Sequence, residues 1–161
     1  MNEILISSGK DDWETPKVFY QQLDEEFHFT LDPCCSHKNA KCIKHYTSRE
    51  NGLNMDWGGE TVFCNPPYSV KGKQDAWIRK CYEESKKPNT VVVALIPART
   101  DTERFHEYIW NGRASEVRFI KGRLCFEIDG KPILDKKGRP TPAPFPSMIV
   151  IWRNKEVLKN E

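Results

Sequence analysis

Long hydrophobic runs are absent from the 161-residue sequence. No apolar stretch approaches the roughly 20 residues that a membrane-spanning helix needs, so we expect no membrane association. Residues 1–14 lack the basic start and the apolar stretch of a secretion signal, which favours a cytoplasmic location. Internal repeats, low-complexity tracts and Gly/Ser-rich linkers are absent too. We therefore expect a single domain that covers residues 1–161.

Three familiar catalytic motifs are also missing. The sequence has no Gly-x-Ser-x-Gly turn, no Walker A loop and no His-Glu-x-x-His pair. These absences argue against a serine hydrolase of the α/β type, a P-loop nucleotidase and a zinc protease of the common helical type. The chemistry must therefore come from other patterns.

The six cysteines are expected to be thiols, because the sequence carries no export signal and the cytosol is reducing. Cys34, Cys35, His37, Cys42 and His45 crowd into one short segment, which raises the question of a metal. Their spacing is irregular, however, since structural zinc sites usually pair cysteines two to four residues apart. We predict no metal and buried thiols that act as small apolar groups. A bound zinc ion is the alternative.

Neither sign of charge dominates, since 25 Lys and Arg face 23 Asp and Glu and the net charge is +2. That balance alone is a poor case for a nucleic-acid partner. Residues 118–139 nevertheless contain seven basic and three acidic residues. We expect residues 118–146 to form a hairpin and loop that contact DNA phosphates; a merely solvated hairpin is the alternative. The predicted contacts are Arg123, Lys131, Lys136, Lys137 and Arg139.

Hydrophobic periodicity predicts alternating helices and strands. Residues 34–54 are polar and irregular and receive no assignment. The expected fold is α/β, with a mostly parallel sheet and an antiparallel C-terminal hairpin. We expect helices at residues 17–26, 75–85 and around 105–109, parallel strands at 27–32, 61–64 and 90–96, and further strands near 116–120, 123–128 and 146–152.

The turn Asn65-Pro66-Pro67-Tyr68 directly follows the predicted strand 61–64. Its two prolines fix φ and remove two backbone donors, so the Asn65 side-chain oxygen and the Pro66 carbonyl can both act as acceptors. An exocyclic base amine is a poor nucleophile because its lone pair is delocalised. Two acceptors that hold its hydrogens favour the attacking geometry. The turn therefore predicts chemistry on a planar amine.

Tyr68 adds an aromatic ring to this turn. Enzymes that modify a base commonly flip it out of the helix and stack it on such a ring. A structural loop with an aromatic plug is the alternative reading. Pro-Pro-Tyr also occurs in partner-binding peptides, but those lie in disordered proline-rich tracts and not after an apolar strand.

Several blocks in a fixed order resemble the phage- and prophage-type DNA N6-adenine methyltransferases related to the Dam enzymes. The resemblance covers nearly the whole chain. It implies a Rossmann-like methyltransferase fold, S-adenosylmethionine as cofactor and a flipped adenine in double-stranded DNA as substrate. It also suggests a short palindromic site containing GATC, which would suit a homodimer. The blocks are 13–16, 29–34, 51–53, 56–57, 62–69, 95–98, 122–126 and 145–147.

The same resemblance assigns functional residues. Asn65, Pro66, Pro67 and Tyr68 would form the catalytic motif. Thr15-Pro16 and Asp32-Pro33 would flank the methionine end of the cofactor, and Asp56-Trp57 would lie near its adenosine part. Asp32 could bind the methionine ammonium, and Asp56 a ribose hydroxyl or the adenine amine.

One departure from the usual pattern concerns the cofactor. Most methyltransferases of this type carry a glycine-rich turn after the first strand, whereas residues 32–36 read Asp-Pro-Cys-Cys-Ser. Two other functions stay open. The same turn fits methylation of RNA or of a protein glutamine amide, and a non-catalytic nucleic-acid-binding module could keep this fold.

Overall fold

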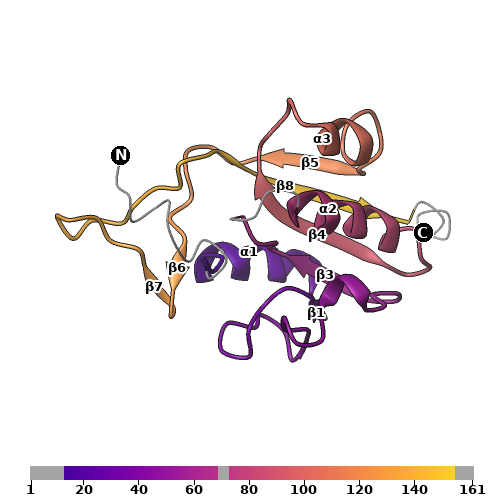
Figure 1. Ribbon diagram of the computed structural model, residues 1–161, viewed down its shortest axis with the longest axis horizontal. Coiled ribbons are helices and arrows are strands. Elements are labelled where there is room, and N and C mark those ends of the chain that lie inside the picture. Colours follow the sequence, from indigo (N-terminus) through magenta and orange to yellow (C-terminus); the bar gives the residue numbers. More distant parts are fainter. Residues whose placement is uncertain (1–12, 69–72, 155–161) are drawn as a thin grey trace.

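A six-stranded sheet crosses the part of the chain that the computed structural model describes, residues 13–68 and 73–154 (Figure 1). The strand order is β2-β1-β3-β4-β8-β5. Neighbours from β2 to β4 are parallel, whereas β8 is antiparallel to both β4 and β5. The elements are α1 (Lys17–Phe27), β1 (Leu31–Asp32), β2 (Lys44–His45), η3 (Gly52–Asn54), β3 (Thr61–Cys64), α2 (Lys73–Glu84), β4 (Val91–Pro97), α3 (Glu103–Tyr108), β5 (Glu116–Phe119), β6 (Glu127–Ile128), β7 (Lys131–Pro132) and β8 (Ser147–Arg153).

The mostly parallel α/β sheet with an antiparallel C-terminal part is confirmed, with one refinement. β8 lies between β4 and β5 instead of forming an edge. Because β8 is antiparallel to both, β5 runs in the same direction as β4. The last strand is therefore inserted, and it is buried on both faces. None of the helices in the described ranges is long and apolar enough to span a bilayer.

The central strands bury both of their faces because their side chains alternate between two apolar layers. In β4, Val92, Ala94 and Ile96 join the layer that includes buried residues of α2 and α3. Val93 and Leu95 face the opposite layer, with buried residues of α1 and of the segment 120–146. The continuous apolar run in this strand thus reflects a sheet covered on two sides.

Helix α1 extends one residue beyond its predicted end, and the predicted strand 27–32 is wrong over its first four residues. His28 takes a left-handed conformation with φ 55° and donates its N–H to the carbonyl of Asp24. The Asp24 side chain then accepts the N–H of Phe29 at 2.9 Å. These local bonds hold the chain in a helix end, so the strand begins only at Leu31.

Residues 120–146 form an arm that extends away from the sheet (Figure 1). The predicted strand 123–128 is short, because only Glu127–Ile128 pairs with Lys131–Pro132. Glu127 also forms an antiparallel bridge with Glu14, with N···O distances of 2.8 and 3.0 Å. The arm is thereby joined to the segment that precedes α1.

Candidate active site

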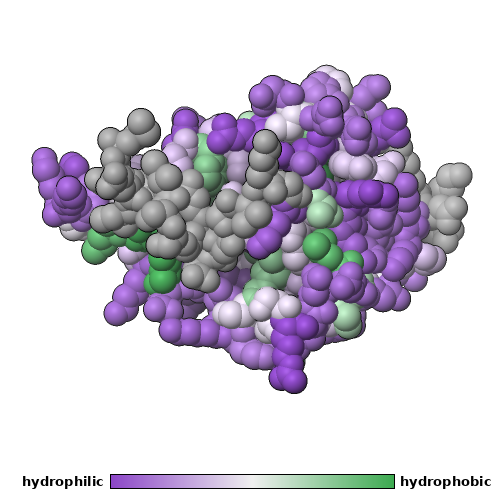
Figure 2. Space-filling view, viewed as in Figure 1, coloured by the Kyte–Doolittle hydropathy of each residue, from purple (hydrophilic) through white to green (hydrophobic). Residues whose placement is uncertain are grey.

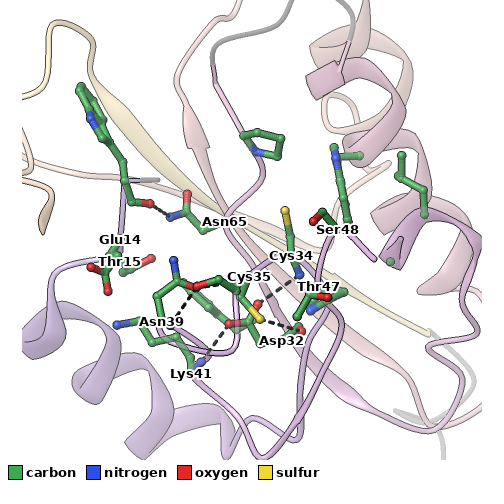
Figure 3. A pocket seen from close by; sticks show the side chains of 18 of the residues that line it. Glu14, Thr15, Asp32, Cys34, Cys35, Asn39, Lys41, Thr47, Ser48 and Asn65 are labelled. Atoms are coloured by element: carbon green, nitrogen blue, oxygen red, sulfur yellow. Dashed lines mark hydrogen bonds between the residues drawn. The ribbon is translucent and has the colours of Figure 1, made fainter. Parts of the chain in front are cut away.

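A cavity of about 440 Å³ opens at the carboxyl ends of β1 and β3 (Figure 3). Its volume lies in the range of about 300–1,000 Å³ that is usual for small-molecule sites. Ligands of open α/β sheets commonly bind at this edge, beyond the carboxyl ends of parallel strands. Of the predicted site residues, Thr15, Asp32, Pro33, Asn65 and Pro67 line the cavity.

Asp32 ends β1 and is 4% exposed. Its Oδ2 accepts the backbone N–H of Lys41 at 3.0 Å, and its Oδ1 accepts that of Cys34 at 3.3 Å. Burial raises the pKa of this carboxyl, although the two N–H groups oppose the rise. The Asp32 side chain thus fixes the loop that replaces a glycine-rich turn. A cation in the cavity would stabilise the charged form of this carboxyl.

Gly52 allows this loop to pack closely. A Cβ at this position would lie 2.1 Å from the carbonyl oxygen of Pro33. The Gly52 carbonyl accepts the indole N–H of Trp57 at 3.0 Å. Trp57 is fully buried and does not line the cavity, so it supports the wall from behind.

Thr15 contributes a buried hydroxyl with no partner. Its side chain lines the cavity, the residue is 1% exposed, and Oγ1 has no hydrogen-bond partner among the described residues. Thr15 does not cap α1, because Pro16 occupies the N-cap position, from which no side chain bonds to the helix start. Buried hydroxyls are nearly always hydrogen-bonded, so Oγ1 needs a partner that the described residues do not supply.

The turn after β3 brings Asn65 to the cavity edge. The Asn65 Nδ2 donates to the carbonyl of Trp13 at 3.4 Å, and its Oδ1 accepts the hydroxyl of Tyr68. Pro66 is buried and is not part of the cavity lining. Both the nitrogen and the oxygen of the Asn65 amide thus have partners. An incoming amine would have to replace the Tyr68 hydroxyl at the amide oxygen.

Tyr68 does not line the cavity but packs in an aromatic cluster. Its ring centroid lies 6.5 Å from that of Trp13, 5.7 Å from Phe126 and 5.4 Å from Phe145. Two of these partners, Phe126 and Phe145, belong to the arm. Burial raises the pKa of the Tyr68 hydroxyl well above its ordinary value, so it remains a donor at neutral pH.

Asp56 lies at the other end of β3, outside the cavity lining. Its side chain is 78% exposed and forms an ion pair with Lys87 at 2.7 Å. The hydrogen bond from Lys87 lowers the pKa of this carboxyl. Asp56 also accepts the backbone N–H of Gly58 at 2.8 Å. The structure therefore does not bring Asp56 to the residues predicted to hold the methionine end.

The basic residues predicted to contact DNA lie on the arm, whose far end is hydrophilic in Figure 2. Lys131, Lys136 and Lys137 are exposed. Arg139 pairs with Asp135 at 3.0 Å. The exposed Arg123 also reaches an arm carbonyl, that of Ala143, at 3.4 Å.

Arg118 contributes to the basic character of this segment but is used inside the protein. It forms bonds to Glu26 at 2.6 and 2.7 Å and to Glu116 at 2.8 and 3.1 Å. Two carboxylates therefore neutralise this guanidinium, and it is a poor candidate for a phosphate contact.

The cysteines and histidines of residues 34–45 have separate partners, and Cys34, Cys35 and Cys42 are partly exposed and not buried as predicted. His37 Nδ1 lies 2.8 Å from His45 Nε2. The Cys35 thiol donates to the carbonyl of Asp32, and the Cys42 thiol lies 3.7 Å from the Tyr20 hydroxyl. Across the described residues, His, Cys, Asp and Glu side chains form no group of three or more that could hold a metal.

Several lining residues were not identified from the sequence. They come mainly from residues 34–53, which carried no clear periodicity, and from α2. For the start of the segment 34–53, the one available signal was its position just after the end of a parallel strand. These lining residues include Trp13, Asn39, Lys41, Thr47, Ser48 and Trp77.

Comparisons with known proteins show the family of this chain. A family model described as DNA N-6-adenine-methyltransferase (Dam) matches residues 4–159. The chain is 30% identical over 130 residues to a DNA N-6-adenine-methyltransferase of Haemophilus phage HP1 (strain HP1c1), covering 76% of this chain and 73% of that protein. It is also 35% identical over 65 residues to the "Putative methyltransferase YfdM" of Escherichia coli (strain K12), covering 36% of this chain and 71% of that protein.

Proposed function

Because the chain belongs to the DNA N6-adenine-methyltransferase (Dam) family, we propose that it transfers a methyl group from S-adenosylmethionine to an adenine N6 in double-stranded DNA. The observation that carries the proposal is the position of Asn65. Its amide lies at the edge of a cavity formed by two parallel strand ends. A cofactor in the cavity and a base at the turn would therefore lie next to each other.

The residues of the cavity fit S-adenosylmethionine. Its volume of about 440 Å³ accommodates a small ligand, and its lining combines apolar groups such as Trp77 with polar ones. Thr15 offers an unpartnered buried hydroxyl, and Asp32 offers a buried carboxylate. Pro33 places a rigid backbone between the Asp32 side chain and the rest of the loop. We propose that these residues hold the amino-acid end of the cofactor.

Asn65 would orient the attacking amine. The sulfonium of the bound cofactor supplies an electrophilic methyl group, so no strong base is required. The Asn65 oxygen accepts a hydrogen of the adenine amine once the Tyr68 hydroxyl has left it, and the Pro66 carbonyl accepts the other. The bond between Asn65 Nδ2 and Trp13 keeps the oxygen pointed away from Trp13. Such an aligned acceptor lowers the barrier by orienting the lone pair toward the methyl.

Tyr68 would hold the flipped base, and the arm would hold Tyr68. Phe126 and Phe145 pack on the Tyr68 ring, so an arm seated on DNA presents the ring next to the target nucleotide. The exposed cations of the arm supply phosphate contacts, which position a protein on the duplex without reading its sequence. Replacing Lys136, Lys137 and Arg139 together with alanine is expected to weaken DNA binding and to flatten its salt dependence.

The target sequence is proposed from the family resemblance, as a short palindrome containing GATC. A homodimer would match such a palindrome. Mapping of methylated positions on unmethylated bacterial DNA tests the sequence, and sedimentation with and without DNA tests the dimer. Methylation at unrelated sequences, or a chain that stays monomeric on DNA, would reject the respective proposal.

The reaction is tested directly by its product. Purified protein is incubated with S-adenosylmethionine and unmethylated bacterial DNA, and the digested nucleosides are analysed by mass spectrometry, with the Asn65→Ala variant as control. N6-methyladenine formed by the wild type alone supports the proposal. N4-methylcytosine would correct the base. A methylated RNA or protein glutamine in parallel assays, without methylated DNA, would replace the proposed substrate, and no transfer to any acceptor would favour a binding module.

A further inference from the structure

One wall of the cavity carries a lysine, Lys41, whose backbone is bonded to Asp32. Lys41 lines the cavity and is only half exposed. Its backbone is fixed on both sides, because its N–H donates to Asp32 at 3.0 Å and its carbonyl accepts the Tyr20 hydroxyl at 3.2 Å. Its ammonium lies 5.6 Å from the centroid of the Tyr20 ring. The side chain therefore runs from Asp32 toward the first turns of α1.

Thr15 lies at the same end of α1 and on the same side of the cavity as Lys41 in Figure 3. Its unpartnered hydroxyl is buried there. The first backbone N–H of α1, that of Lys17, is already taken by Glu127 at 3.3 Å. The Lys41 ammonium and the Thr15 hydroxyl at this wall match the chemistry of an anionic group.

We propose that Lys41 and Thr15 bind the α-carboxylate of the methyl donor, while Asp32 faces its α-ammonium. The inference rests on the proposed function, which supplies a ligand with an amino-acid end. A zwitterionic amino acid needs a cation and an anion of the protein a short distance apart, and the adjacency of Lys41 and Asp32 provides both. The charge on Lys41 also lies beside the buried Asp32 carboxylate and offsets part of its desolvation.

The test compares two ligands that differ only at this end. S-adenosylhomocysteine carries the amino-acid end, whereas 5′-methylthioadenosine lacks it. Calorimetry with the wild-type chain should give tighter binding of S-adenosylhomocysteine. Lys41→Met and Thr15→Val should each weaken that binding by about tenfold, since a hydrogen bond to a charged group contributes on that order. Both should leave 5′-methylthioadenosine within about twofold of the wild type.

Lys38→Met is the matched control. Lys38 lies in the same loop, its side chain is 75% exposed, and it pairs with Asp129 of the arm at 2.6 Å outside the cavity. This variant should bind both ligands as the wild type does, and Lys41→Arg should restore most of the lost affinity. Thermal unfolding of each variant checks that the fold is intact.

Each remaining outcome decides against one of the two proposals. Equal weakening of both ligands by Lys41→Met would mean that Lys41 only shapes the Asp32 loop, and equal wild-type affinities would mean that the amino-acid end is not recognised. Either result overturns the inference but leaves the cofactor site in place. A wild-type chain that binds neither ligand would instead overturn the proposed function itself.

Discussion

The two ends of β3 differ in how their polar groups are satisfied. At the amino end, Lys87 pairs with Asp56 at 2.7 Å and with Glu84 at 2.5 Å, so the charges there are neutralised within the protein. At the carboxyl end, the Thr15 hydroxyl has no partner among the described residues and the Asn65 oxygen faces an exchangeable hydroxyl. The amino end therefore has the character of a structural support, and the carboxyl end that of a binding site.

The largest effect is expected at the carboxyl end. Asn65→Ala should fold and bind S-adenosylhomocysteine but lose methyl transfer by about a hundredfold, because an aligned acceptor in a dry site is worth on the order of 3 kcal/mol. Initial rates with labelled cofactor measure the loss, and calorimetry measures the binding. An unchanged rate, or a loss of cofactor binding with the fold intact, would contradict the role given to Asn65.

Glu84→Gln should break the support at the amino end. Glu84 is buried, and its carboxylate accepts from Lys80, Lys87 and the Trp57 N–H. Removing one partner of a buried ion pair costs about 3 kcal/mol, so the variant should unfold more easily while its cofactor affinity stays unchanged. Thermal unfolding at pH 7 measures the first effect.

The pH dependence of that loss follows from the Glu84 pKa. Burial raises the pKa, but hydrogen bonds from Lys80 and Lys87 outweigh it and hold the pKa below its ordinary value of 4.5. A carboxyl with a lowered pKa stabilises the fold above its ordinary pKa, and this contribution is lost as pH falls through the folded-state pKa. The difference in unfolding midpoint between the wild type and Glu84→Gln should therefore shrink below about pH 4.5. A difference that grows there would refute this assignment.

A matched pair of aspartates tests the comparison from both ends. Asp32→Asn should weaken S-adenosylhomocysteine binding by about tenfold, since it removes the charge that we propose faces the ammonium. Asp56→Asn should change that binding by less than about twofold, because Asp56 lies outside the cavity lining. A larger effect at Asp56 would restore the contact with the adenosine part that the family resemblance implies, and it would erase the contrast between the two strand ends.

The smallest effect is expected for Tyr68→Phe. This change removes the hydroxyl bound to Asn65 but keeps the ring and its packing on Phe126. Methyl transfer should stay within about threefold of the wild type, whereas Tyr68→Ala should lose the stacked base and most of the rate. If Tyr68→Phe were as inactive as Tyr68→Ala, the hydroxyl and not the stacking would carry the role of this residue.

Local patterns were sufficient to predict much of the fold. The apolar run near Val91–Pro97 and the short run Thr61–Cys64 both form the expected central strands, because a strand buried on two faces requires continuous apolar residues. The strand predicted at 27–32 is wrong over its first four residues, since its alternation does not reveal that Asp24 bonds to His28 and Phe29. The insertion of β8 between β4 and β5 depends on tertiary pairing that no local pattern contains.

Two parts of the site were predictable because they follow strand ends. Asp32 and Asn65 could be placed on one cavity because the carboxyl ends of parallel strands share an edge. Lys41 and Thr47 lie in an irregular segment, so only the folded chain shows that they reach the cavity. Asp56 differs from Asp32 and Asn65, because it was assigned from the family resemblance and not from its position after a strand.

The bridge between Glu14 and Glu127 makes the segment Trp13–Thr15 a joint between the cavity and the arm. Two ligands that both act on this segment are linked thermodynamically. If DNA shifts this segment when it binds the arm, then DNA must change the affinity for the cofactor, and the cofactor must change the affinity for DNA by the same factor. If that factor is greater than one, the complex that holds both DNA and cofactor is favoured whichever binds first.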